Sequence, residues 1–316
     1  MTNTFEIEGL SDGDQKSAVW RQFFFAIWRL LRPYQWIKNT LVYVPLFAAH
    51  QYGDLSGMML LMGAFGVFNL VSSSAYIIND LLDVEHDRLH PRKKNRPFAA
   101  GELRLMVGWI LAPLLFCLAM VCCYVFFPMR FMGCLLGYFL LTLAYSIQLK
   151  KYSSLDVLVL ACLYTLRIIA GGLAISLNLS FWLLTFALLI FLSLAWIKRY
   201  IEVSALQRNN SLDVVPGRGY VAEDLHFIAG VGPCAGYLSV LVLALYIQDN
   251  TASYLYHSPH LLWLACPLLL YWISYIWLVA YRGMMDDDPI LFAVKDKVSL
   301  FVAILFITIG VFATIL

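Results

Sequence analysis

Charged residues are scarce in this sequence of 316 residues. Only 13% are Asp, Glu, Lys or Arg, whereas 61% are hydrophobic, and the mean hydropathy is +0.76. A soluble domain of this length could not bury so much apolar surface, so the composition excludes an ordinary soluble protein. The net charge of +2 arises from local clusters that nearly cancel, so it gives no indication of a nucleic-acid partner. We therefore predict an all-α polytopic membrane protein.

Two further features are lacking. The seven cysteines show no metal-ligand spacing, and their odd number argues against a complete disulfide framework, so we expect small core or lipid-facing residues. No cleavable signal peptide is visible, because residues 1–18 (MTNTFEIEGLSDGDQKSA) are polar and acidic. We expect residues 1–21 to form a flexible cytoplasmic tail and residues 22–316 to form the membrane domain.

Long apolar runs account for most of the remaining chain. A spanning helix needs about 20 mainly apolar residues. The runs predict nine spans, near residues 25–48, 56–80, 104–127, 130–148, 155–176, 180–200, 225–247, 260–282 and 298–316. In the first of them WRLLRPYQWIKN is amphipathic, which also suits a helix lying partly along the membrane interface.

The cations alternate between the predicted connections. They gather before the first span and in the 2–3, 4–5, 6–7 and 8–9 connections, whereas the 1–2, 5–6 and 7–8 connections have none and 3–4 has only Arg130. Cytoplasmic loops carry the excess of Lys and Arg. We expect the N-terminus in the cytoplasm, the C-terminus outside, and all charged loops on one face.

The acidic stretch NDLLDVEHD lies at the end of the second predicted span. If that helix continues, Asp80, Asp83 and Asp87 project from one side over two turns. Carboxylates stacked in this way repel one another unless a cation lies among them. Such hard oxygen ligands suit magnesium, which binds through one or two carboxylates plus a substrate phosphate. We expect a magnesium–diphosphate site here, with a solvated acidic helix end paired to Lys93, Lys94 and Arg96 as the alternative.

The loop HPRKKNRP follows directly. Pro91 and Pro97 stop any helix and hold Lys93, Lys94 and Arg96 in a short loop, where these cations could reach phosphate oxygens. The same loop could be an ordinary positive-inside signal. We expect His90 to donate hydrogen bonds within the loop or to phosphate, because no partner histidine is suitably spaced for a metal.

A second group of charges lies at residues 145–172. Ser153 or Ser154 could cap the fifth span, which places Asp156 in its first turn and Arg167 three turns further on, within an apolar run. An arginine at that depth is costly, so it should face a watery cavity or an anion, or pair with Asp156 or Asp80. Gly171 and Gly172 would allow close helix packing.

Two more charged clusters follow. IKRYIE at 197–202 carries Lys198, Arg199 and Glu202 and is followed by RGY at 218–220. DDDPILFAVKDK at 286–297 is interpreted as an interfacial loop.

Together these motifs resemble the UbiA superfamily of intramembrane transferases. The resemblance rests on NDxxDxxxD after the second span, on YSxxLK before the fifth, and on nine spans. HPRKKNRP and LDVLVLACLYTLRIIAGG are more similar to the decaprenyl-phosphate phosphoribosyltransferase branch than to the aromatic prenyltransferases. The resemblance implies a UbiA-like helical bundle around a central cavity open to the cytoplasmic side, in a bacterial inner membrane, and a possible homotrimer.

One departure from the prenyltransferase pattern favours that branch. Those enzymes usually carry a second DxxxD motif for another metal, whereas here Asp156 is followed four residues later by Leu160. Arg167 stands in the same helix, which suits a phosphate better than a metal.

The resemblance implies transfer of 5-phosphoribose from phosphoribosyl diphosphate to a polyprenyl phosphate, with Mg²⁺ as cofactor. It implies metal ligands at Asp80, Asp83 and Asp87, and catalytic roles for Asp80, Asp83, Asp156 and Arg167. The expected substrate-binding residues are Lys38, Asn79, Lys93, Arg96, Tyr145, Lys150, Lys198 and Arg199.

Two other functions fit parts of the sequence. An aromatic prenyltransferase would use the same acidic motif to ionise a prenyl diphosphate, with aromatic side chains shielding a carbocation. A transporter would also have many spans, but its charges should lie toward the midplane between repeats, and no internal repeat is evident.

Overall fold

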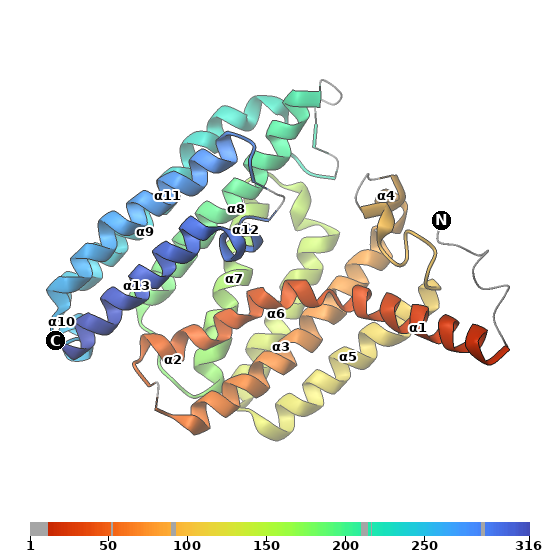
Figure 1. Ribbon diagram of the computed structural model, residues 1–316, viewed down its shortest axis with the longest axis horizontal. Coiled ribbons are helices and arrows are strands. Elements are labelled where there is room, and N and C mark those ends of the chain that lie inside the picture. Colours follow the sequence, from red (N-terminus) through yellow and green to blue (C-terminus); the bar gives the residue numbers. More distant parts are fainter. Residues whose placement is uncertain (1–11, 52, 90–92, 210–213, 216, 286–287) are drawn as a thin grey trace. The chain divides into compact units, whose positions relative to one another are not determined.

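The computed structural model is helical throughout the part of the chain that it describes, residues 12–51, 53–89, 93–209, 214–215, 217–285 and 288–316 (Figure 1). Within those residues the β-structure is limited to one isolated bridge between Val214 and Val221. The predicted all-α class is therefore confirmed.

The α-helices are bounded as follows: α1 Asp12–Leu31, α2 Val44–Ala48, α3 Leu55–Leu82, α4 Val84–Leu89, α5 Leu105–Phe126, α6 Met129–Ile147, α7 Leu155–Ala174, α8 Phe181–Asn209, α9 Leu225–Gln248, α10 Asn250–Leu255, α11 Ala265–Tyr281, α12 Pro289–Lys295 and α13 Lys297–Ile315. Short 3₁₀ segments are η2 Pro33–Tyr43, η3 Lys93–Asn95, η4 Leu149–Lys151, η5 Ala222–Asp224 and η6 Pro259–Leu264. Eight helical segments of the described chain are long and apolar enough to cross a membrane, and each matches one of the predicted spans from the second to the ninth.

The first predicted span, 25–48, does not form such a helix. α1 ends at Leu31, Arg32 has a positive φ of 54°, and the chain continues as η2 and α2. Pro33 explains the break, because proline disfavours the α conformation in the residue before it and has no N–H to donate. The count of nine spans is therefore not supported by the described residues.

The predicted flexible tail overlaps α1. This helix begins at Asp12, so residues 12–21 are helical, while residues 1–11 lie outside the described part of the chain. The boundary predicted between tail and membrane domain thus falls inside a helix.

The described chain divides into two compact units. Unit 1 comprises the described residues of Met1–Asn39 together with Phe65–Phe139, and unit 2 comprises Thr40–Ala64 and Leu140–Leu316. Because α3 and α6 each contribute to both units, this division does not test the prediction of one transferase domain over 22–316.

The core of unit 1 joins α1 to the end of α3 and the start of α5. Ala26 and Leu30 of α1 pack in one buried cluster with Ile77, Phe98 and Ala112. Their i, i+4 spacing places Ala26 and Leu30 on one face of α1. This apolar face accounts for the packing of α1 within the unit.

Within unit 1, polar side chains of α3 bond to the first part of η2, residues 33–39. Trp36 Nε1 donates to Ser73 Oγ at 3.1 Å, and Asn39 Nδ2 donates to Asn69 Oδ1 at 2.8 Å and Ser72 Oγ at 3.0 Å. Buried polar groups in an apolar environment require such partners. These bonds position Lys38, which is buried in the same segment.

The core of unit 2 is built from α7, α8, α9 and α11. Trp277 Nε1 donates to Ser193 Oγ, which donates to the Gly232 carbonyl oxygen. A Cβ atom at Gly171 would collide with the backbone of Val42, so this glycine allows the close approach predicted for it.

Candidate functional site

The acidic motif forms an almost continuous helix. α3 ends at Leu82 and α4 begins at Val84, with only Asp83 in a turn between them. The Asp83 N–H donates to the Asn79 carbonyl oxygen at 3.0 Å, and the Asp87 N–H donates to the Asp83 carbonyl oxygen at 2.8 Å. The helical path therefore continues beyond Leu82 after one turn residue, and Asp80 and Asp87, which contact the same nitrogen of Arg96, project on one side.

Arg96 joins those two carboxylates. Its Nη1 lies 3.0 Å from Asp80 Oδ1 and 2.6 Å from Asp87 Oδ2, and Asp80 also pairs with Arg32. Both carboxylates are buried, with 2% of each residue exposed. We call Asp80, Asp87, Arg32 and Arg96 the acidic cluster.

The electrostatics of the acidic cluster explain its composition. Two buried carboxylates on one helix face destabilise each other, and a cation between them offsets that repulsion. Arg96 supplies that cation from a short loop, where its backbone N–H donates to the Lys93 carbonyl oxygen at 2.9 Å. The alternative in which the acidic helix end pairs with the basic loop is therefore realised at Arg96, although these carboxylates are buried rather than solvated. His90, Pro91 and Arg92 lie outside the described residues.

The donor set of the acidic cluster bears on the predicted magnesium site. The described residues contain no group of three His, Cys, Asp or Glu side chains arranged to hold a metal ion. Magnesium, however, is usually bound through one or two carboxylates and completes its shell with water and phosphate. The carboxylates of Asp80 and Asp87, which already share one cation, fit that requirement. Asp83 is half-buried in the turn between them.

A second set of charges gathers in unit 2, where both Asp156 and Arg199 are fully buried. Arg199 Nε lies 2.7 Å from Asp156 Oδ2, although its N–H does not point at that oxygen well enough for a hydrogen bond. Arg199 also pairs with Glu202, and Arg218 Nε lies 2.9 Å from Glu202 Oε2. Arg218 Nη1 lies 3.6 Å from Asp156 Oδ2.

Two tyrosines complete this group. Tyr145 Oη accepts hydrogen bonds from Arg199 Nη2 and Arg218 Nη1, both at 3.1 Å. Tyr220 Oη donates to Asp156 Oδ1 at 2.6 Å. We call the set of six residues the arginine cluster: Tyr145, Asp156, Arg199, Glu202, Arg218 and Tyr220.

The loop before α9 is tied to the start of α7. Ser154 occupies the N-cap position, but its side chain does not cap the helix; its backbone N–H donates to Tyr220 Oη at 2.8 Å. Ser153 Oγ donates to the Gly219 carbonyl oxygen at 2.6 Å. Burial, together with the bond to Asp156, raises the pKa of the Tyr220 hydroxyl. The expected side-chain cap by a serine is therefore absent at the start of α7. Ser153 and Ser154 instead form hydrogen bonds with the 218–220 segment.

Arg167 lies deep in α7, as predicted, and is buried. Its Nη1 donates to the Leu163 carbonyl oxygen at 2.5 Å, and its guanidinium carbon lies 5.1 Å from the centre of the Tyr164 ring. Asp156, one expected partner, is engaged by Arg199 and Arg218.

The structure brings together some of the predicted site residues. Asp80, Asp87 and Arg96 meet in unit 1, and Tyr145, Asp156 and Arg199 meet in unit 2. Asn79 and Asp83 are half-buried in unit 1, where Lys93 is exposed; Lys150 and Lys198 are half-buried in unit 2. The roles predicted for all of these residues stay predictions.

Sequence reasoning did not include Arg32, Glu202, Arg218 and Tyr220 among the site residues. Glu202 lies in the motif IKRYIE, and Arg218 and Tyr220 lie in RGY. Arg218 and Tyr220 contact Asp156, which is far from them in the sequence, so the sequence alone did not indicate these contacts. The 286–297 segment has a simpler explanation at its described residues, since Asp288 caps α12 and Asp296 caps α13.

Residues 40–305 match the model of the UbiA prenyltransferase family. The chain is 37% identical over 280 residues to the uncharacterized protein y4nM of Sinorhizobium fredii, across 87% of this chain and 53% of that protein, so it spans about half the length of that relative. It is 35% identical to the nodulation protein NoeC of Azorhizobium caulinodans, across 88% of this chain and 90% of that one.

It is also 30% identical to decaprenyl-phosphate phosphoribosyltransferase of Mycolicibacterium smegmatis, across 85% of this chain and 86% of that enzyme. Among solved structures, a UbiA homolog from Archaeoglobus fulgidus bound to DMAPP and Mg²⁺ shares the fold, with a TM-score of 0.64 and 18% identity across 91% of this chain and 99% of that one. The predicted resemblance is confirmed. The chain is a membrane protein of the UbiA prenyltransferase family.

Proposed function

We propose that this protein transfers 5-phosphoribose from phosphoribosyl diphosphate to a polyprenyl phosphate and releases diphosphate. The relatives named decaprenyl-phosphate phosphoribosyltransferase support the proposal. They do not identify the lipid, since y4nM and NoeC are also similar to this chain.

One observation supports phosphoribosyl diphosphate, rather than a prenyl diphosphate, as the donor substrate. Asp156 is the sole acidic residue in α7, and its two oxygens contact Tyr220, Arg199 and Arg218. An aromatic prenyltransferase with a second metal would need free carboxylates on this helix. With its carboxylate already neutralised, α7 is better suited to phosphate groups than to a second metal.

The acidic cluster would bind the diphosphate end of the donor. Asp80 and Asp87, with Asp83, would hold the Mg²⁺, which when bound supplies positive charge that stabilises the departing diphosphate. Arg96 lies against the same carboxylates and can donate to phosphate oxygens. Asn79 would orient the diphosphate.

The bond changes in the transfer balance without a general base. The ribose C1–O bond to diphosphate breaks, the diphosphate leaves with the electron pair, and an oxygen of the acceptor phosphate bonds to C1. Because that phosphate is already anionic near neutral pH, it requires positioning rather than deprotonation.

Positive side chains would position the ribose 5-phosphate and the acceptor phosphate. The candidates are Lys38, Lys93, Lys150, Arg167 and Lys198. Arg199 and Tyr145, which were also predicted to bind substrate, are bonded to each other within the arginine cluster, so their contacts favour a positioning role. Asp156 is retained as a catalytic candidate, but its contacts favour a positioning role, because its carboxylate is fully buried against Tyr220, Arg199 and Arg218.

The cellular setting is part of the proposal. We place the protein in a bacterial inner membrane with its N-terminus in the cytoplasm and its C-terminus outside, so that the charged loops meet a cytoplasmic donor. The central cavity, the homotrimer and the absence of a nucleic-acid partner stay predictions.

The test uses the purified full-length protein with Mg²⁺, radiolabelled phosphoribosyl diphosphate and polyprenyl phosphates of several lengths. Label should enter the organic phase, and Asp83→Asn and Arg167→Ala should reduce the transfer. Arg88→Ala is the matched control, since the Arg88 side chain is exposed and pairs with Glu85 at the surface. Absence of transfer, together with turnover of a prenyl diphosphate and an aromatic acceptor, would overturn the proposal.

A further inference from the structure

Helix α1 has two apolar faces, of which only one is buried. Ala26 and Leu30 belong to the core of unit 1. Trp20, Phe24, Phe25 and Trp28 are instead 60%, 64%, 62% and 51% exposed. Trp20, Phe24 and Trp28 follow an i, i+4, i+8 spacing, so they form one stripe beside the core face.

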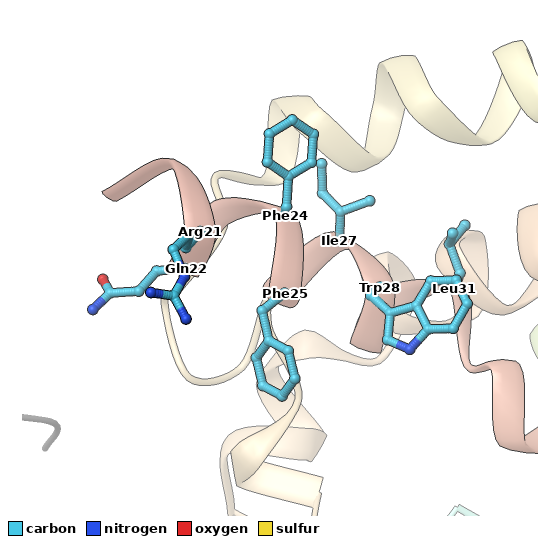
Figure 2. A pocket seen from close by; sticks show the side chains of 7 residues that line it. All are labelled: Arg21, Gln22, Phe24, Phe25, Ile27, Trp28 and Leu31. Carbon is cyan, nitrogen blue, oxygen red and sulfur yellow. The ribbon is translucent and has the colours of Figure 1, made fainter. Parts of the chain in front are cut away.

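Aromatic side chains on the exposed face of α1 make ring contacts in two pairs. The Trp20 and Phe24 rings lie 6.1 Å apart, and Trp28 contacts Trp36 edge to face at 5.7 Å. Figure 2 shows Phe24, Phe25 and Trp28 projecting from the helix, with Arg21 and Gln22 nearer its N-terminal end. We call Trp20, Phe24, Phe25 and Trp28 the aromatic face.

The position of α1 in unit 1 indicates what this face contacts. α1 packs against Ile77 and Leu81 near the end of α3 and against Leu111, Ala112 and Leu115 in the first half of α5. The same cluster includes Val84, Phe98 and Leu103, which lie in the connection between these two candidate membrane spans. α1 therefore lies at the level of a membrane boundary.

The polar edge of α1 points to the charged loop between those spans. Arg29 Nη1 donates to Glu102 at 3.0 Å, and Arg29 Nη2 donates to the Asn95 carbonyl oxygen. Gln22, seven residues earlier, is exposed on the same edge. A helix with an aromatic face, a polar edge and an Arg is typical of helices that lie in the membrane interface.

The lipid-facing surface of α5 provides the neighbouring hydrophobic surface. Trp109 and Ile110 are more than half exposed on this spanning helix, near the residues that pack against α1. Exposed apolar surface at this level requires lipid rather than water around it.

We propose that the aromatic face of α1 binds the lipid of the membrane interface, with α1 lying along the membrane surface. The residue that follows α1 is Arg32, which pairs with Asp80. Lipid binding thereby anchors Arg32 of the acidic cluster through the helix that precedes it. This inference rests on the membrane spans and holds for either candidate donor.

Photocrosslinking to lipid in the reconstituted full-length protein tests the proposal. p-Benzoylphenylalanine is placed at Phe24, at Gln22 on the polar edge, or at Ile110 of α5, one position per variant. Each variant is incorporated into vesicles that contain radiolabelled phosphatidylcholine and is irradiated. All three positions are exposed, so the fold should tolerate the changes, and elution as a single species confirms it.

Lipid adducts at position 24 should approach those at 110 and exceed those at 22 several-fold. Adduct at position 24 no greater than at position 22 would overturn the proposal. So would crosslinking of position 24 to another part of this chain or to a second copy, since the face would then be covered by protein.

Discussion

The acidic cluster and the arginine cluster share one arrangement, a guanidinium between two carboxylates. In unit 1 Arg96 joins Asp80 and Asp87, and in unit 2 Arg199 joins Asp156 and Glu202. The Arg96 side chain is 23% exposed and comes from a short loop, whereas that of Arg199 is 0% exposed and comes from the long helix α8.

This difference in exposure indicates which of the two arginines, Arg96 or Arg199, can be displaced from its carboxylates. Breaking a buried ion pair leaves an uncompensated charge, and this cost falls as the partners gain access to water. Arg199 is further held by Tyr145, while Arg218 neutralises the same carboxylates. We infer that the acidic cluster can exchange its arginine for a metal and substrate, whereas the arginine cluster holds α7, α8 and the 218–220 segment together.

The largest effect on stability is expected for Asp156→Asn. The variant leaves Arg199 and Arg218 with Glu202 as their remaining carboxylate in the cluster, so the free energy of unfolding should fall by about 3 kcal/mol. Thermal unfolding in detergent measures it, with Asp80→Asn as the matched variant. Asp80→Asn should lose less, because Arg96 is partly exposed and keeps its pair with Asp87; an equal or greater loss would contradict the comparison.

The free energy of unfolding should fall by about 2 kcal/mol in Tyr220→Phe, because this change removes a buried hydrogen bond to a charged acceptor. The raised pKa of Tyr220 adds a pH dependence. Its contribution to stability is complete below the unfolded pKa of about 10 and is lost as the pH rises toward the higher folded value. Wild type should therefore lose more stability than Tyr220→Phe between pH 9 and pH 11 (roughly one unit either side of that pKa).

The control for that measurement is Tyr281→Phe, since Tyr281 is 66% exposed. It should follow the alkaline profile of wild type. An unchanged alkaline decline in Tyr220→Phe would show that the bond to Asp156 does not contribute as inferred.

Arg96→Gln tests whether a metal can replace Arg96 between Asp80 and Asp87 of the acidic cluster. Without Mg²⁺ the variant should lose about 1 kcal/mol, because Asp80 and Asp87 lose a shared donor. Added Mg²⁺ should then raise the melting temperature of the variant more than that of wild type. Equal shifts in both proteins would argue against a metal between these carboxylates.

The smallest effect is expected for Arg88→Ala. Arg88 and Glu85 form a surface ion pair at 3.0 Å, with side chains 49% and 83% exposed. Such pairs contribute roughly 0–1 kcal/mol, so stability and transfer activity should stay close to wild type. A large loss would show that surface charge around α4 matters as much as the buried cluster.

Local sequence patterns predicted the features that depend on residues close together in the sequence. Eight spans followed from long apolar runs, and the common side of Asp80 and Asp87 followed from helical spacing. The break at Arg32 was missed because the count of apolar residues outweighed the effect of Pro33. The contact of Asp156 with Arg199 was missed because spacing along the chain does not specify which side chains meet between different helices.

The most direct measurement compares two donors on one preparation of wild type and Asp80→Asn: labelled phosphoribosyl diphosphate with a polyprenyl phosphate, and a labelled prenyl diphosphate with an aromatic acceptor. We predict Mg²⁺-dependent transfer from the phosphoribosyl donor alone, abolished in an Asp80→Asn protein that remains folded. Transfer from the prenyl donor alone, or phosphoribosyl transfer that survives in Asp80→Asn, would contradict the account.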